Sequence, residues 1–225
     1  MSIGNGATAT LTLDGTTYTS TGAQTYEAND INITAGADVT FTTTNTAVEF
    51  QDGAAGQIVL SDDTDLTITT SGGNITIAPT IAGTDSGGGN TAEDITLNAA
   101  GGTVTLSNTG AAVLATDIGD VTLTGATIAL SNSITSTGTN SAGNAATIDI
   151  NGAVTLNDND ITFTTGGAGI DFSSTIVSGS TTPRALTIAQ GTGAVVINGN
   201  IGGTANNDVG NITCLLYTSD AADES

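Results

Sequence analysis

Val39-Thr40-Phe41, Ile95-Thr96-Leu97 and Val121-Thr122-Leu123 share one pattern, in which a threonine stands between two large apolar residues. The pattern, with Ile, Val or Leu first and Ile, Leu or Phe last, occurs ten times in the chain. Side chains of a β-strand alternate between its two sides, and β-branched residues are common in strands. The pattern therefore predicts many short strands, each with one buried side and with threonine on the exposed side.

These strands recur in longer units of unequal length. Units of similar pattern begin at Ile75, Ile128 and Ile170, and the first of these intervals is longer than the second. The difference in length lies in stretches rich in Gly, Ser, Thr and Asn, such as residues 84–91 and 136–144. A constant strand framework with loops of variable length is typical of a solenoid. We expect an all-β fold, a single right-handed parallel β-helix over residues 1–213, with about ten coils of roughly 20 to 25 residues.

In such a fold the apolar residues of each tripeptide face the core, and the central threonine faces water. The positions expected to point inward are Val39, Phe41, Ile75, Ile77, Ile95, Leu97, Val104, Leu106, Val121, Leu123, Ile148, Ile150, Val154, Leu156, Leu186 and Ile188.

The charge of the chain is one-sided, with one Lys or Arg against 22 Asp and Glu and a net charge of −21. Arg184 is the single basic side chain and cannot neutralise a series of phosphates, so we expect no nucleic-acid partner. No apolar run approaches the roughly 18 residues of a membrane span, and we expect no membrane insertion of this segment. An acidic surface without lysine suits an extracellular or high-salt setting, where cations screen the repulsion.

The two ends of the sequence differ from the rest. Residues 214–225 resemble the translated read-through of a common sequencing adapter, so we expect them to be a non-native tail that follows Thr213. This tail contains Cys214, the only cysteine. The residues after Met1 lack the basic and apolar regions of a signal peptide. We therefore expect residues 1–213 to be an internal fragment, truncated at both ends.

Several segments resemble the repeats of very large bacterial surface proteins of the filamentous-haemagglutinin and autotransporter-adhesin type. They are Thr21–Tyr26, Ala37–Phe41, Gly169–Phe172, Leu186–Ile188 and Thr192–Ile197 with the Asn200–Gly203 that follows. The resemblance implies a secreted, elongated right-handed parallel β-helix that serves as a stalk or adhesin, located outside the cell or on its outer surface. It also implies two kinds of partner: host or environmental glycans or other cell-surface molecules, and neighbouring repeats of the same full-length protein.

Catalytic groups are scarce in this sequence. The chain has no His, which excludes a Ser-His-Asp or Cys-His arrangement and His-based zinc sites. Asp149 and Asp171 each stand between two apolar residues, point outward, and could form a glycosidase-like pair on neighbouring coils. No aromatic platform for a sugar accompanies them, and a solvated strand face explains them equally well. We expect no enzyme, no catalytic residue and no cofactor, with a polysaccharide-acting β-helix as the alternative.

Two acidic clusters, Asp62-Asp63-Thr64-Asp65 and Asp158-Asn159-Asp160, offer the oxygen ligands that calcium prefers. Neither matches an EF-hand loop or a glycine-rich calcium repeat. Asp and Asn also stabilise turns through their own backbone. We therefore expect no metal site, and a calcium-binding solenoid remains an alternative.

Rows of outward threonine suggest one more alternative, an ice-binding solenoid. Thr67 and Thr69, and likewise Thr40, Thr42 and Thr44, alternate on one side of their strands. A flat surface that matches ice needs two outward threonines on each coil and a constant coil length. The intervals between these threonines vary, which argues against this alternative.

Overall fold

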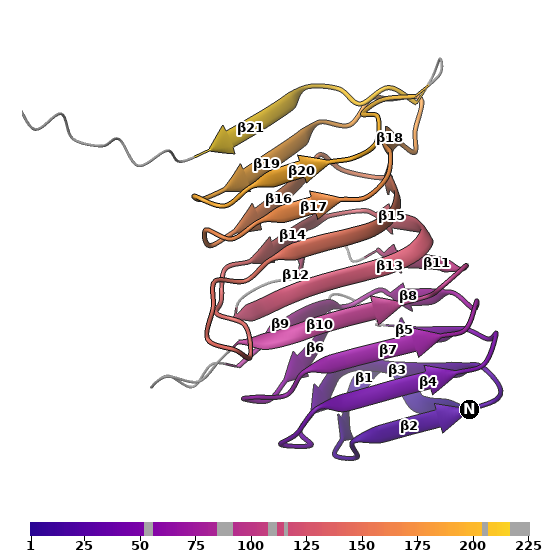
Figure 1. The fold of residues 1–225 in the computed structure, drawn as a ribbon. Coiled ribbons are helices and arrows are strands. Elements are labelled where there is room, and N and C mark those ends of the chain that lie inside the picture. Colours follow the sequence, from indigo (N-terminus) through magenta and orange to yellow (C-terminus); the bar gives the residue numbers. More distant parts are fainter. Residues whose placement is uncertain (52–55, 85–91, 108–111, 115–116, 204–206, 217–225) are drawn as a thin grey trace, which may run out of the picture.

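The computed structural model describes residues 1–225 except 52–55, 85–91, 108–111, 115–116, 204–206 and 217–225. Within the described residues the chain forms 21 strands and no helix. The strands stack as a parallel β-solenoid of about seven turns, wound in the right-handed sense (Figure 1). The fold class predicted from the tripeptides is confirmed. A helix long and apolar enough to cross a membrane is absent from this described part.

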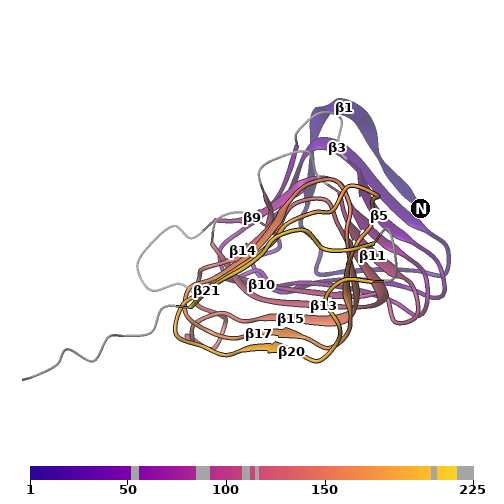
Figure 2. The same ribbon diagram turned by 90° about the horizontal axis from the view of Figure 1, so that it is seen from above.

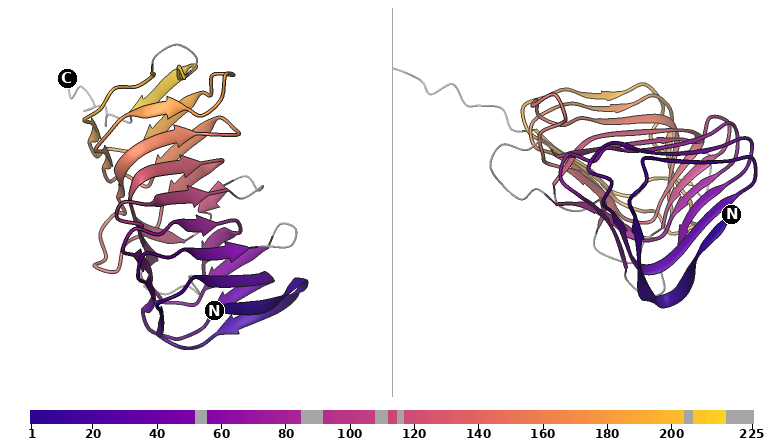
Figure 3. Two further views of the ribbon diagram at one scale, coloured as in Figure 1. Left: turned by 90° about the vertical axis from the view of Figure 1, so that its right-hand side faces the viewer. Right: turned by 90° about the horizontal axis from the view of Figure 1, so that it is seen from below.

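Viewed along its axis, the solenoid has a roughly triangular cross-section, so each turn contributes a strand to three faces (Figures 2 and 3). We call them face A, face B and face C in the order in which the chain passes through them from Thr17 onward. Hydrogen bonding joins every strand to its counterparts on the neighbouring turns in parallel register. Each turn therefore contacts only the turns directly above and below it, as in other solenoids.

Four long strands bend around a corner and serve two faces: β1 (Ser2–Leu13) and β3 (Gln24–Ile33) run from face B to face C, and β13 (Ile118–Leu130) and β15 (Ile148–Leu156) from face A to face B. The other strands of face A are β2 (Thr17–Ser20), β4 (Val39–Thr43), β7 (Leu66–Thr70), β10 (Glu93–Asn98), β17 (Ile170–Phe172) and β20 (Val195–Ile197). Those of face B are β5 (Val48–Gln51), β8 (Ile75–Ile77), β11 (Thr103–Leu106) and β18 (Ile176–Ser178). Those of face C are β6 (Gln57–Leu60), β9 (Thr80–Gly83), β12 (Ala112–Leu114), β14 (Ser133–Ser136), β16 (Ile161–Thr165), β19 (Leu186–Gln190) and β21 (Ile212–Leu216).

The turns are fewer than the sequence predicted, and their lengths differ. Ile148 pairs with Ile170 on the next turn, whereas a longer stretch of chain separates Leu66 from its partner Ile95. The prediction of about ten coils is wrong. Each turn carries three strands plus corner loops, so most turns use more residues than the expected repeat.

The predicted equivalence of the three long repeat units is also wrong, because the third unit begins on a different face. Ile75 and Ile128 both lie on face B, two turns apart, as their common pattern predicted. Ile170, the start of the third predicted unit, instead pairs with Ile148 on face A. All three faces carry the same alternation of apolar and polar residues, so that alternation cannot distinguish one face from the next.

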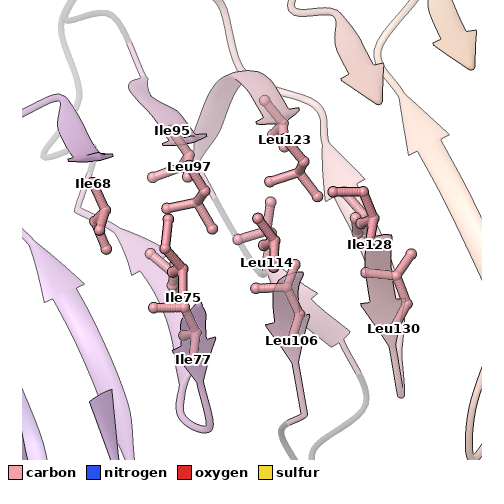
Figure 4. Packing of buried hydrophobic residues seen from close by; sticks show 14 of the residues in the cluster. Ile68, Ile75, Ile77, Ile95, Leu97, Leu106, Leu114, Leu123, Ile128 and Leu130 are labelled. Carbon is pink, nitrogen blue, oxygen red and sulfur yellow. The ribbon is translucent and has the colours of Figure 1, made fainter. Parts of the chain in front are cut away.

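A single apolar core runs through the stack. All sixteen positions predicted to point inward are buried, with at most 1% of each residue exposed. The threonines between them, such as Thr96 and Thr122, point outward and are half-buried. Figure 4 shows inward side chains of successive turns lined up along the stack, with Ile68, Leu97 and Leu123 among them, and all three belong to one buried cluster. The inward assignment made from the sequence is confirmed.

Glycine marks the corner between faces A and B. A Cβ at Gly73, Gly102 or Gly152 would collide with the backbone carbonyl of Thr46, Gly73 or Gly125, one turn below. Only a residue without a side chain allows the backbone to approach this closely. Glycine in these turns therefore permits the same tight corner on successive turns.

The last strand crosses the boundary predicted between residues 213 and 214. β21 extends to Leu216 and pairs with β19, so the strand does not stop at Thr213. From Asn211 to Leu215 all side chains are exposed. The adapter origin of residues 214–225 stays a prediction, and residues 217–225 lie outside the described part.

The core predicts a sharp difference between adjacent positions of β13. Leu123→Asp places a charge inside the stack and should lower the free energy of unfolding by about 4 kcal/mol or more. Thr124→Asp, one residue later and pointing outward between Asn98 and Asn151, should cost far less. Thermal unfolding followed by circular dichroism measures both, and equal melting temperatures for the two variants would contradict the inward assignment.

Candidate functional site

The most regular surface of the molecule lies on the first five turns of face A. Two columns of outward side chains run up these turns, formed by Thr17, Thr40, Thr67, Thr96 and Thr122 and by Thr19, Thr42, Thr69, Asn98 and Thr124. Nine of the ten are threonine. We call these ten residues the threonine array.

Unequal turns do not disturb the threonine array. The sequence intervals between successive members of the first column differ from turn to turn, yet each member pairs directly with the next. Intervals of different length therefore leave the register of face A unchanged. The argument that variable intervals would break the rows is therefore wrong. Thr44, which was grouped with Thr40 and Thr42, lies beyond the end of β4 and outside the array.

The array rests on a tightly packed layer. The inward residues of β4 and β7, among them Phe41 and Ile68, are fully buried. At the lower end the rings of Tyr18 and Phe41 stack with their centroids 4.8 Å apart, and Tyr26 meets Phe41 edge-on at 5.2 Å. These contacts fix the strands from below, so the outward threonines have little backbone freedom.

A column of carboxylates borders the array where the chain enters face A. They are Asp38, Asp65, Asp94 and Asp120, and each directly precedes one of the apolar residues Val39, Leu66, Ile95 and Val121, which pair in sequence on successive turns. The Oδ1 atom of Asp65 accepts a hydrogen bond from the amide of Asp94 at 2.8 Å, and Asp94 accepts one from the amide of Asp120 at 2.6 Å. Asp120 in turn accepts one from the amide of Thr147 at 2.7 Å. Each of these three carboxylates thus caps the strand start of the following turn.

The same stacking places like charges close together. Burial raises the pKa of Asp65, and the charges of Asp94 and Asp38 add to the rise. The hydrogen bond from the Asp94 amide opposes it. The raised pKa of Asp65 means that protonation of this carboxyl group, or screening of the neighbouring charges by cations, stabilises the folded chain. Asp65 therefore makes the stability of the fold depend on pH and salt.

Asp149 and Asp171, the predicted carboxylate pair, lie on neighbouring turns of face A in direct register. Burial raises the pKa of Asp149, and the charges of Asp171 and Asp120 add to the rise. The outward residues below and above the pair are Thr122 and Val196, so these two positions supply no aromatic platform for a sugar ring. The structure brings the pair together on a strand face. The absence of a catalytic role for this pair stays a prediction.

The two acidic clusters contribute to turns. In the second cluster, Asp158 accepts a hydrogen bond from the Ser131 hydroxyl at 2.7 Å, and Asp160 accepts one from the amide of Ala185 at 2.8 Å. In the first cluster, Asp63 adopts the left-handed conformation with φ of 57°. Among the described residues, three or more Asp, Glu, His or Cys side chains nowhere gather as a metal would require. The absence of a metal site stays a prediction.

One buried carboxylate was missed at the sequence level. Glu93 begins β10, and its side chain is fully buried at the corner between faces C and A. Within the described part of the chain, no hydrogen bond of normal geometry reaches either carboxylate oxygen. The side chain packs so closely over Gly83 that a Cβ there would collide with Oε2. The sequence pattern could have predicted this burial. Glu93 lies two residues before Ile95 and four before Leu97, so its side chain is expected on the same inward side of the strand.

Burial is the main cause of the raised pKa of the Glu93 carboxyl group. Desolvation raises the pKa of Glu93 from 4.5 to about 7, the backbone amides of Glu93 and Thr84 oppose this rise, and the charges of Asp62 and Asp117 add to it. A carboxyl group in this environment prefers to be protonated, so its ionised form destabilises the folded chain at neutral pH.

Comparisons with protein-family models, with curated proteins and with solved structures found no match to this chain.

The buried Glu93 predicts a specific pH dependence. The folded chain binds the Glu93 proton more tightly than the unfolded chain, so stability should fall as the pH rises from about 4.5 to about 7. Glu93→Gln removes this titration and should raise the free energy of unfolding at about pH 8 by about 2 kcal/mol. Chemical unfolding at several pH values measures the effect.

Glu49→Gln is the matched control, since Glu49 lies on face B and points outward. It should leave the pH dependence of the parent unchanged. If Glu93→Gln also leaves it unchanged, the inward position of Glu93 is wrong.

Proposed function

We propose that this chain is a structural stalk or adhesive passenger segment of a large secreted bacterial surface protein, without catalytic activity. The observation that carries the proposal is the continuous stack: parallel pairing continues from β1 to β21, and one buried apolar core continues from Leu13 of β1 to Ile188 of β19. A solenoid of this kind can extend by the addition of turns, because each turn needs contacts only with the turns next to it. The stalk role fits this regularity better than direct receptor contact does.

The surface chemistry supports an extracellular setting. The chain has one basic residue against 22 acidic ones, and its outward strand positions are rich in threonine. Its single basic residue, Arg184, donates from Nε to the backbone carbonyl of Asn157 at 3.2 Å. The partners we propose are further repeats of the same protein and glycans or other cell-surface molecules. Nucleic acid is a poor partner for this charge.

Surface location can be tested with antibodies raised against the purified chain. They should label intact cells that produce the full-length protein, without permeabilisation, because a stalk or adhesin lies outside the cell. Labelling that appears only after permeabilisation would overturn the proposed location.

The rival is a polysaccharide-acting enzyme, which the pair Asp149 and Asp171 favours. Incubation with a panel of polysaccharides, followed by mass spectrometry of the products, separates the two functions. We expect no cleavage. Cleavage that Asp149→Asn and Asp171→Asn abolish, and that the turn variant Asp158→Asn retains, would replace the stalk by the enzyme.

A further inference from the structure

We propose that the threonine array on face A binds the surface of crystalline ice. This is a second function, beyond that of a stalk, and it rests on the geometry and charge of the array alone.

The array repeats in two dimensions. Neighbouring turns are about 4.8 Å apart, and the two columns are about 7 Å apart, since they lie two positions apart along each strand. A ligand that matches many positions at once must itself be a lattice with these repeats. The oxygen atoms on crystal faces of hexagonal ice repeat at distances of this size, whereas a dissolved molecule offers no such repeat.

Each threonine presents a hydroxyl, which donates and accepts hydrogen bonds, beside a methyl group. None of the nine hydroxyls has a hydrogen-bond partner within the described part of the chain, so all are available to water. The β-branched side chain restricts rotation about χ1, and the packed layer below fixes the backbone. Little conformational entropy is therefore lost when the array meets an ordered surface.

The charge distribution agrees with an uncharged ligand. The chain carries 22 acidic residues, yet none of them is among the ten positions of the array. The neighbouring aspartates Asp65, Asp94 and Asp120 use carboxylate oxygens to accept hydrogen bonds from backbone amides. Within the two columns themselves, charge first appears on the next turn, where Asp149 follows Thr122 in register. An ionised side chain is strongly hydrated and would not fit into an ice lattice, so the array ends there.

The main competing ligand is a crystalline polysaccharide, which also repeats. Sugar rings stack on aromatic side chains, and the ten outward positions contain none. Ice, which needs only hydroxyl and methyl groups at the correct spacing, is therefore the ligand that the array favours.

Two substitutions with the same side chain test this proposal. Thr67→Tyr puts a bulky group at the centre of the first column, between Thr40 and Thr96, and should lift a flat ice surface away from the array. Thr76→Tyr is the control on β8 of face B, between Glu49 and Thr105. Inhibition of ice recrystallisation and thermal hysteresis are measured for the full chain and both variants, with circular dichroism to compare their folding.

We expect the parent and Thr76→Tyr to inhibit recrystallisation equally, and Thr67→Tyr to lose most of this activity at an unchanged melting temperature. If Thr67→Tyr fails to fold, Thr122→Lys, which puts a charge into the array, provides the same test. A parent chain that affects ice no more than serum albumin at equal concentration would overturn the proposal. So would equal activity of the Thr67→Tyr and Thr76→Tyr variants, or binding to crystalline cellulose or chitin without any effect on ice.

Discussion

Parallel hydrogen bonding between successive turns places each strand residue about 4.8 Å from its counterpart on the next turn. Residues one full turn apart in the sequence, such as Leu66 and Ile95, thereby become nearest neighbours, whatever lies in the loops between them. Side chains that occur once per turn form columns, apolar inside and polar outside. Loop length is then free to vary, whereas a shift of a single residue on any strand would turn its apolar side chains toward water.

The same register determines what polar groups can do. Asp65, Asp94 and Asp120 stand in one column, which brings their charges together but lets each carboxylate accept a hydrogen bond from the following turn. The carboxylates of the column repel one another, but each also accepts a hydrogen bond at the start of a strand. Salt weakens the repulsion by screening it. Glu93 is less well compensated: the backbone amides of Glu93 and Thr84 oppose the rise of its pKa, but no hydrogen bond of normal geometry reaches its carboxylate oxygens within the described residues. Glu93 is thus an ionisable group buried in an otherwise apolar core. Because its pKa differs between the folded and unfolded chain, it makes stability depend on pH.

The alternation of apolar residues and threonine predicted the fold class and every inward position tested, because burial on one side of a strand is a local property. The number and phase of the turns were not predictable in this way. They depend on which strands pair, and the segments at Ile75 and Ile170 look alike although they lie on different faces. The regularity of the threonine columns could not be predicted for the same reason. The number of residues between successive threonines includes loop residues, which do not affect the register of the strands. Glu93 could have been found by extending the alternation of Ile95 and Leu97 back toward the start of the strand.

Register on face A is the central claim, and engineered histidines test it most directly because the chain has no His of its own. Thr96 and Thr122 are far apart in sequence but pair on neighbouring turns, whereas Thr96 and Thr105 are close in sequence but lie on different faces. A metal held by two histidines stabilises the folded state by mass action. Added Ni²⁺ should therefore raise the melting temperature of the Thr96→His, Thr122→His variant and leave that of the Thr96→His, Thr105→His variant unchanged. An increase for the second variant only, or for neither, would contradict the parallel in-register stack.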